Sequence, residues 1–208
     1  MKIKKNIIIA ALLSLLPILI GLLLWDKLPA EIPTHFGIDG AVDSYSSKLF
    51  AVVIFPAILA VVVLFIGFMI MHDPKQKNIN NKLVNVGIFA VPVVSIIMNT
   101  CIYIMALGYS VDITSITLIG IGILFIIIGN YLPKTKQNYT VGIKISWALN
   151  SSENWNRTHR LASRLFILAG IVIIIDAWLK SMILLLVVIA MIIIVPMVYS
   201  YTLYKKGI

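Results

Sequence analysis

Long apolar runs, separated by short polar segments, dominate the pattern of the chain. Runs of about 18 or more apolar residues are typical of transmembrane helices. The pattern predicts six such spans, at about residues 6–25, 49–71, 83–107, 113–132, 162–179 and 182–204. The sequence therefore predicts an all-α integral membrane protein in which residues 1–208 form a single membrane domain.

Composition supports this fold class. Hydrophobic residues make up 61% of the chain and charged residues 12%, with a mean hydropathy of +1.04. Soluble globular proteins have roughly 45–50% apolar and 25% charged residues. The N-terminus resembles a signal peptide, with Lys2, Lys4 and Lys5 before an apolar core. That core is long and no small-x-small cleavage site follows it, so we expect a retained first span.

Basic residues are distributed unevenly between the two sides of the predicted spans. Of the 17 Lys and Arg residues, only Lys27, Lys48 and Lys180 lie on the opposite side from the N-terminus. Because cytoplasmic segments carry the excess of Lys and Arg, both termini are predicted to face the cytoplasm. Residues 26–48 then form an outer loop, and residues 133–161 form a cytoplasmic loop. Insertion and anionic membrane lipids explain the net charge of +9, so we expect no direct binding of nucleic acid.

The cytoplasmic loop and its flanks form the longest polar stretch of the chain. Pro133 ends the fourth span because a proline disfavours helical geometry in the residue before it. The segment QNYTVGIKIS that follows is rich in β-branched and aromatic residues, which favours extended or irregular backbone. Gly142 is a predicted turn or point of close approach. A helix is then expected to begin at Asn150, with Glu153 in the capping-box position.

This helix is predicted to be amphipathic and to lead into the fifth span. Trp155, His159, Ala162 and Phe166 recur at helical spacing on one face, and Arg157, Arg160 and Arg164 recur on the opposed face. An interfacial anchor explains most of this pattern, with arginines at lipid phosphates and tryptophan at headgroup level. It leaves unexplained Trp147, which is expected in a non-helical segment, and the compact group Trp155, Thr158, His159 and Arg160.

The outer loop is interrupted by prolines and glycines, which exclude a continuous helix. Glu31, His35, Asp39 and Asp43 recur every four residues and would form a metal-competent face on a helix. On an interrupted backbone this spacing loses its meaning. We therefore expect a turn-rich cap over the helices and no metal site.

Two of the predicted spans contain polar residues that are candidates for a specific role. Ser95 and Asn99 are one helical turn apart, and we expect them to take part in helix packing. An intramembrane acid such as Asp176 is a functional candidate by default. Because Trp178 and Lys180 mark the membrane interface directly after it, we expect Asp176 to be a solvated or snorkelling acid.

No pattern in the chain indicates an enzyme or a cofactor. His159 has no serine, cysteine or carboxylate at the spacing of a catalytic motif. The HExxH, GxSxG and phosphate-loop patterns are also missing from the sequence. We therefore expect a protein without catalytic residues.

Two motifs resemble a known family. GNYLPKTKQNYTVGIKISWALNSSENWNRTHRLAS resembles the signature of the SdpI family of bacterial membrane immunity proteins, in which a GNY-P-----N---GI--PW-L-----W--THR pattern links two spans. The outer loop, LPAEIPTHFGIDGAVDSYSSK, resembles the LP--IP-H----G--D-Y--K element of the same proteins. In the first motif, Lys144 and Ser146 replace the usual Arg and Pro, and lysine lacks the planar fork of arginine.

The resemblance implies a set of functional positions in each loop. In the cytoplasmic loop they are Asn130, Pro133, Asn138, Gly142, Lys144, Trp147, Leu149, Trp155, Thr158, His159 and Arg160. In the outer loop they are Pro33, His35, Gly40, Asp43 and Lys48.

The resemblance also implies a function at the bacterial cell membrane. The best-understood activity of the family is immunity, in which the membrane protein protects the producing cell from a secreted antimicrobial peptide of the cannibalism type. In that system the protein is also a signal transducer, because the toxin-occupied protein holds a cytoplasmic autorepressor, a transcriptional repressor, at the membrane. The expected partners are therefore a secreted peptide toxin at the outer loop and a repressor at the basic inner loops.

A small transporter or permease is the alternative interpretation. Asn99 and Asp176 are polar residues within spans, and Leu28-Pro29 after span one is echoed by Leu132-Pro133 after span four. Three plus three spans would be typical of an inverted repeat.

Overall fold

The computed structural model describes residues 2–37 and 39–208; Met1, and Ile38 in the predicted outer loop, lie outside the described residues. The described chain is mostly helical and contains six helices that are long and apolar enough to cross a membrane. They cover Ile3–Leu23, Phe50–Met71, Asn81–Ala106, Ile113–Lys134, Ser152–Leu179 and Met182–Lys205. Each of the six predicted spans coincides with one of these helices. The fifth helix begins ten residues before its predicted span, because the amphipathic segment is continuous with it.

The chain divides into two compact units. The first contains residues 1–67 and 87–117, and the second contains residues 68–86 and 118–208. Helices α3 (Phe55–Met71), α4 (Asn81–Ala106) and α5 (Ile113–Tyr131) each begin in one unit and end in the other. Each unit is described by itself below.

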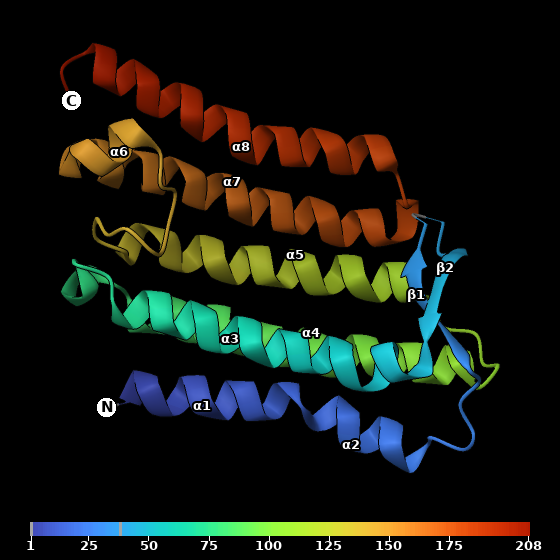
Figure 1. The fold of residues 1–208 in the computed structure, drawn as a ribbon. Helices are drawn as coiled ribbons and strands as arrows, with labels where there is room; N and C mark the ends of the chain where they lie inside the picture. Colours follow the sequence, from blue (N-terminus) through green and yellow to red (C-terminus); the bar gives the residue numbers. More distant parts are fainter. Residues whose placement is uncertain (1, 38) are drawn as a thin grey trace. The chain divides into compact units, whose positions relative to one another are not determined.

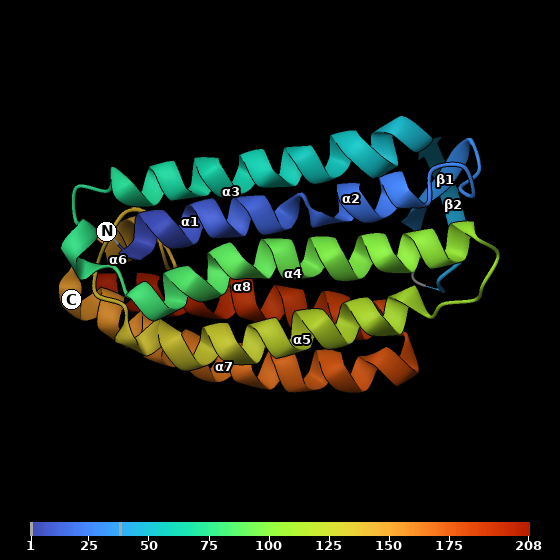
Figure 2. The ribbon, with the colours of Figure 1, turned by 90° about the horizontal axis from the view of Figure 1, so that it is seen from below.

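The first unit packs α1 (Lys2–Ser14) and α2 (Leu16–Leu23) beside α3 and α4 (Figure 2). A proline near the start of α2 separates the two short helices, because Pro17 has no amide to donate. Its carbonyl accepts a hydrogen bond from the Tyr103 hydroxyl of α4 at 3.2 Å. Gly21 of α2 faces Tyr103 and Val52 so closely that a Cβ there would lie 2.5 Å from Val52 Cγ1. Proline and glycine thus permit this close packing.

Ser95 and Asn99 take part in helix packing, as expected. Both are buried, with 1% of their surface exposed. The Asn99 amide donates to the Ser95 carbonyl at 2.7 Å, and the Ser95 hydroxyl donates to the Ser14 carbonyl of α1 at 3.5 Å. Their polar groups are therefore paired inside the protein.

A β-hairpin lies between α2 and α3 (Figure 1), so the all-α prediction is wrong in this segment. Strand β1 (Glu31–Phe36) pairs with β2 (Val42–Ser47) in antiparallel register, with Ile32 opposite Ser46. The chain reverses at Gly40, which has a φ of +82°. The Asp39 carboxylate accepts a hydrogen bond from the Ala41 amide in the same turn. The prolines and glycines exclude a helix, as predicted, but they permit a hairpin.

The strand β1 is attached to the core of the first unit by its apolar side chains. Ile32 is fully buried and belongs to a cluster that also contains Leu28, Val52, Tyr103 and Ile113. A π-helix, η1 (Phe50–Ile54), follows β2 and leads directly into α3. The hairpin is therefore an ordered part of the unit.

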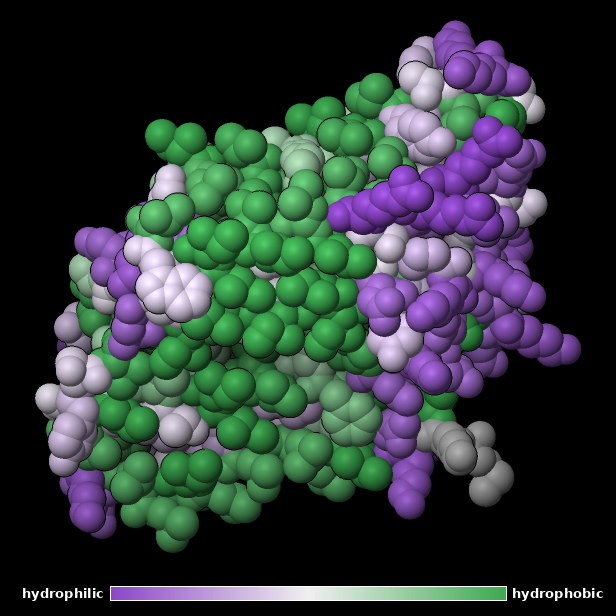
Figure 3. Space-filling model, turned by 180° about the vertical axis from the view of Figure 1, so that it is seen from behind, coloured by the Kyte–Doolittle hydropathy of each residue, from purple (hydrophilic) through white to green (hydrophobic). Residues whose placement is uncertain are grey.

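The second unit contains α7 (Ser152–Leu179) and α8 (Met182–Lys205) beside most of α5 (Figure 1). Lys180, in the left-handed region with a φ of +50°, ends α7, and the Ser181 hydroxyl caps α8 by accepting from the Leu184 amide. Hydrophobic residues cover much of the visible surface in Figure 3, and hydrophilic residues gather at its margins. This distribution is that of a multi-pass cell membrane protein.

Asp176 is fully buried in α7, so the expectation of a solvated or snorkelling acid is wrong. It lies on the face of α7 that also carries Ile173 and Ala177, and this face packs against Leu118 and Val188. One carboxylate oxygen accepts a hydrogen bond from the Ser181 amide at 2.9 Å. The other has no hydrogen-bond partner among the described residues. Asp176 is buried because it lies on the packed face of α7, although Trp178 and Lys180 follow it directly in the sequence.

Helices α5 and α7 approach each other closely at a pair of glycines. A Cβ on Gly122 of α5 would lie 2.6 Å from the Gly170 carbonyl of α7, and a Cβ on Gly170 would lie 2.4 Å from the Gly122 carbonyl. Small residues at such crossings permit close approach of the backbones.

We expect Gly122→Ala to destabilise the protein by about 1–3 kcal/mol, because the added methyl overpacks this crossing. Thermal unfolding in detergent measures the change. Gly120→Ala is the matched control in the same helix, since a Cβ there has no atom within 4 Å and alanine is the better helix former. Equal unfolding temperatures for the two variants would contradict the close packing.

Candidate functional site

The site lies in the second unit, where the segment after α5 folds against the start of α7. This segment contains the short 3₁₀-helix η3 (Leu132–Lys134), irregular backbone from Thr135 to Ile145, and helix α6 (Ser146–Asn150). The irregular backbone confirms the prediction for QNYTVGIKIS. Trp147 was expected in a non-helical segment but belongs to α6.

The cap of α7 also differs from the prediction. Asn150 is the last residue of α6, and Ser151 is the residue that caps α7. The Ser151 hydroxyl accepts from the Asn154 amide at 3.2 Å, because extended backbone at Ser151 directs its side chain toward the first turn. Glu153 forms an ion pair with Arg157 and makes no capping box with Asn150.

The two faces predicted for the start of α7 are confirmed. Trp155, His159 and Ala162 are buried, while Arg157, Arg160 and Arg164 are exposed. Phe166 is half-buried and stacks on Phe125 of α5 with ring centroids 5.2 Å apart. The apolar face of this helix therefore packs inside the unit.

Trp155 and His159 attach the irregular segment to α7. The Trp155 indole donates to the Thr135 carbonyl at 2.8 Å, and its ring stacks on the His159 ring with centroids 4.0 Å apart. The Ile143 amide donates to His159 Nε2 at 3.0 Å. Because an amide only donates, Nε2 must accept, so the proton lies on Nδ1 and is donated to the Trp155 carbonyl at 2.8 Å. The neutral imidazole satisfies both bonds.

Gly142 is the position where the segment passes closest to these rings. Its φ of +123° is unfavourable for any residue with a side chain. A Cβ there would also lie 2.5 Å from His159 Nε2 and 3.0 Å from the Trp155 ring. The predicted close approach at Gly142 is confirmed, and it explains why this backbone needs glycine.

Asn138 holds the turn that precedes Gly142. Its amide donates to the Lys136 and Val141 carbonyls, both at 2.9 Å. Its side-chain oxygen accepts from the amides of Thr140 and Val141 at 3.0 and 2.6 Å. A single buried asparagine thus replaces the backbone pairing that this irregular turn does not have.

Asp73, which follows α3, docks the same segment from the other side. It is buried and accepts hydrogen bonds from the Lys75 amide at 2.7 Å, the Tyr139 amide at 2.9 Å and the Thr140 hydroxyl at 2.6 Å. Burial by itself raises the pKa of the Asp73 carboxyl. The hydrogen bonds, led by that from the Thr140 hydroxyl, outweigh burial and hold the pKa below its ordinary value.

Gln137 extends this docking. Its side-chain oxygen accepts from Lys75 Nζ at 2.8 Å, and its amide donates to the Leu149 carbonyl at 2.6 Å. The Asn78 side chain donates to the Gln137 carbonyl at 2.8 Å. The α3–α4 connection, the irregular segment and α6 are therefore joined by one hydrogen-bond network.

Thr158 belongs to a second buried network, between α7 and α8. Its hydroxyl donates to the Asn154 side-chain oxygen at 3.1 Å, and the Ser200 hydroxyl of α8 donates to the same oxygen at 2.7 Å. The Asn154 amide in turn donates to the Ser200 carbonyl at 2.9 Å. All three residues are buried.

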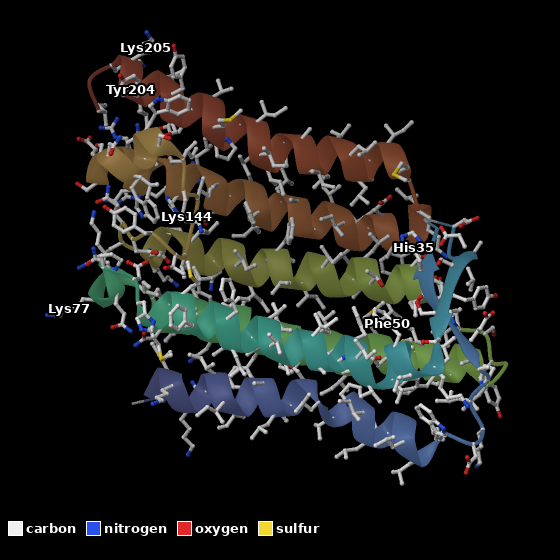
Figure 4. All side chains as sticks on the ribbon, viewed as in Figure 1. His35, Phe50, Lys77, Lys144, Tyr204 and Lys205 are labelled. Atoms are coloured by element: carbon white, nitrogen blue, oxygen red, sulfur yellow. The ribbon has the colours of Figure 1, made fainter. Side chains whose placement is uncertain are left out.

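The predicted cytoplasmic-loop residues fall into two groups. Asn138, Trp155, Thr158 and His159 are buried, and Gly142 is half-buried against them. Exposed positions are Asn130, Pro133, Lys144 and Arg160, with Lys144 shown in Figure 4. Trp147 is half-buried and contacts Tyr201 of α8 with ring centroids 5.0 Å apart.

The predicted outer-loop residues lie on or beside the hairpin of the first unit. Pro33 is buried in β1, whereas His35, also in β1 (Figure 4), forms an exposed pair with Asp43 of β2 at 2.5 Å. Gly40 forms the turn. Lys48 donates to the Trp25 carbonyl at 2.9 Å and lies over the Trp25 ring. Among the described residues, no group of three or more His, Cys, Asp or Glu could hold a metal ion.

The site also contains Asp73, Gln137 and Asn154, which no motif in the sequence marks. Asp73 precedes a proline between two spans, a position typical of a turn residue, and two of its partners, Tyr139 and Thr140, lie more than 60 positions later in the chain. Asn154 is a polar residue at helical spacing from Thr158 and is followed by the buried stripe, which is the available signal for burial.

Comparison with known proteins identifies both motifs. Residues 134–200 match the SdpI/YfhL protein family, and residues 12–60 match a domain of unknown function, DUF1648. The immunity protein SdpI of Bacillus subtilis (strain 168) is 27% identical over 206 residues, which cover 98% of this chain and 97% of that protein. The chain is therefore similar to the SdpI/YfhL family over residues 134–200 and to an immunity protein over nearly its full length. No solved structure matches the chain.

The resemblance inferred from the two motifs is therefore confirmed. The SdpI/YfhL match contains the irregular segment, α6, α7 and most of α8, which hold the buried networks around Trp155 and Thr158. Asp73, which docks this segment, lies between the two matched regions. The DUF1648 match contains the hairpin and the start of α3.

We expect the docking by Asp73 to weaken in acid. Its pKa is lower in the folded than in the unfolded protein, so the carboxylate stabilises the fold at every pH above the unfolded-state pKa of about 4. That contribution is lost as the pH falls through the folded-state pKa. Asp73→Asn should lower the free energy of unfolding by about 1–3 kcal/mol at neutral pH, and this deficit should shrink in acid.

Thermal unfolding of both proteins between neutral pH and about pH 3 measures the effect. Glu153→Gln, which removes an exposed carboxylate from the same unit, is the control and should keep the acid loss of the wild type. A constant difference between wild type and Asp73→Asn at every pH would contradict the assignment.

Proposed function

We propose that this protein is a non-enzymatic immunity protein that protects the bacterium producing it from a secreted antimicrobial peptide. The observation that supports this proposal is the similarity to the immunity protein SdpI, which extends over 98% of this chain. It includes both the outer-loop motif and the longer motif of the second unit. The six apolar helices agree with a site of action in the cell membrane.

We propose a single membrane domain with both termini in the cytoplasm. The concentration of Lys and Arg on one side of the spans supports this orientation. In that orientation the hairpin faces outward and the irregular segment faces the cytoplasm. The exposed side chains of the hairpin, including His35, Asp43 and Tyr45, are then available to the toxin.

The same protein is proposed to act as a signal transducer that holds a cytoplasmic repressor at the membrane. The buried residues of the signature are occupied by contacts within the unit, so a partner would meet the exposed ones. Lys144 and Arg160 are exposed basic side chains of the signature. Trp147, three residues after Lys144, is half-buried and therefore partly accessible. The buried networks would hold these residues in place.

Cells that are sensitive to secreted antimicrobial peptides test the immunity role. Producing the wild-type protein should raise their survival, and no protection would contradict the role. Trp147→Ala should impair protection or repressor recruitment at normal membrane levels, because it removes a ring from the proposed surface. Trp178→Ala is the matched control, since Trp178 is 74% exposed at the other end of α7 and should behave like the wild type.

Unchanged survival and unchanged recruitment in Trp147→Ala would contradict the role of this tryptophan. They would leave the immunity proposal intact, because wild-type protection is measured separately.

A small transporter is the second candidate, and the buried Asp176 favours it. Its unpartnered oxygen lies within a helix that can cross the membrane, and intramembrane acids are frequent in ion and substrate pathways. The transporter hypothesis predicts substrate flux in proteoliposomes that Asp176→Asn abolishes. An immunity protein that only binds its partners predicts no flux with either protein.

A further inference from the structure

An aromatic patch at the C-terminal end of α8 has no role in the networks described above. It consists of Trp147 of α6 with Tyr201 and Tyr204 of α8, and Lys205 lies beside it (Figure 4). The Trp147 ring centroid lies 5.0 Å from that of Tyr201 and 6.4 Å from that of Tyr204. The Lys205 Nζ lies 5.6 Å from the centre of the Tyr201 ring.

The patch is open to its surroundings. Tyr201 and Tyr204 are 40% and 54% exposed, as is typical of aromatic residues at the membrane interface. Within the described part of the chain, neither tyrosine hydroxyl, nor the Trp147 indole, nor the Lys205 ammonium has a hydrogen bond to another residue. The indole and ammonium only donate and the hydroxyls can donate. Hydrogen-bond donors gathered around a positive charge are suited to bind a phosphate, which carries several anionic oxygens.

The surface continues from the patch as an apolar strip along α8. Ile194 and Met197 precede Tyr201 and Tyr204 at helical spacing, and they are 51% and 42% exposed. The strip from Ile194 to Tyr204 is about 15 Å long at 1.5 Å per residue. The patch therefore joins a donor-rich, positive end to a longer apolar surface.

We propose that this patch is a binding site for an anionic phospholipid. The lipid phosphate would be bound by Lys205 and the tyrosine hydroxyls, the glycerol region would lie on the Trp147 and Tyr201 rings, and an acyl chain would follow the strip to Ile194. An acidic peptide would complement the charge but would leave the apolar strip uncovered. The inference goes beyond the immunity role and shares Trp147 with the proposed partner surface, so it is tested through Lys205 and Tyr204 by lipid binding and not by protection.

The charge of the surrounding surface agrees with this ligand. In the connections 72–80 and 132–151 the only carboxylate side chain is that of Asp73, which is buried, and Glu153 in the first turn of α7 is paired with Arg157. Exposed basic residues in the same unit include Lys144, Arg160 and Lys206. The carboxylate side chains of these connections would therefore not repel an anionic headgroup.

Native mass spectrometry of the full chain in detergent tests the site, with phosphatidylglycerol compared with phosphatidylcholine of the same acyl chains. The wild type should retain phosphatidylglycerol preferentially, and rising salt should reduce this preference. Lys205→Gln should reduce it about five-fold, as expected for one basic residue near an anionic surface. Tyr204→Ala should weaken the binding of both lipids, because it removes ring contact from the glycerol region.

Lys77→Gln is the matched control, because it removes the same charge from an exposed lysine of the same unit in another element (Figure 4). It should leave the preference nearly unchanged. No preference in the wild type, or equal losses in the two lysine variants, would overturn the proposal. Binding of an oligoglutamate peptide is measured with the same variants. If Lys205→Gln abolished peptide binding but left the phosphatidylglycerol preference unchanged, the proposal would also be overturned, because the patch would then fit an acidic protein segment.

Discussion

The hydrogen bond from the Ile143 amide to the buried His159 ring is the interaction on which the candidate site depends. The backbone from Thr135 to Ile145 belongs to no helix or sheet, yet its polar groups need partners wherever they are shielded from water. Side chains supply them: His159 for Ile143, Trp155 for Thr135, Asn138 for its own turn and Asp73 for Tyr139. The segment is ordered by polar side chains that come from three different parts of the chain.

This arrangement separates two kinds of residue within the family signature. Asn138, Trp155, Thr158 and His159 are buried and bonded inside the unit, so they form the framework. Lys144 and Arg160 are exposed, so they are free to meet another molecule. Lys144 therefore lies at a surface position outside this framework.

Close backbone approach is the second constraint on this fold. Gly142 passes His159 and Trp155 at distances that no side chain would permit, and Gly122 meets Gly170 in the same way between α5 and α7. In the first unit, Gly21 has the same role against Val52. A glycine can be recognised in the sequence as a possible point of close approach, but the sequence does not say which partner it meets. Gly142 was predicted in this sense, whereas Gly120, in an equally apolar run, faces open space.

The sequence alone determined the six spans, the irregular segment and the two faces of the start of α7. These follow from hydrophobic length and helical periodicity, which are local properties of the chain. Only the tertiary structure decided the pairing of β1 with β2, the docking of Asp73 and the burial of Asp176. Each of these depends on atoms that folding brings together. Prolines and glycines limit the conformations of the backbone, and an acid provides hydrogen-bond acceptors. None of them specifies which residue it will contact. Asp176 shows the difference: its neighbours in sequence indicate the membrane interface, while the packing of its helical face places it in the core.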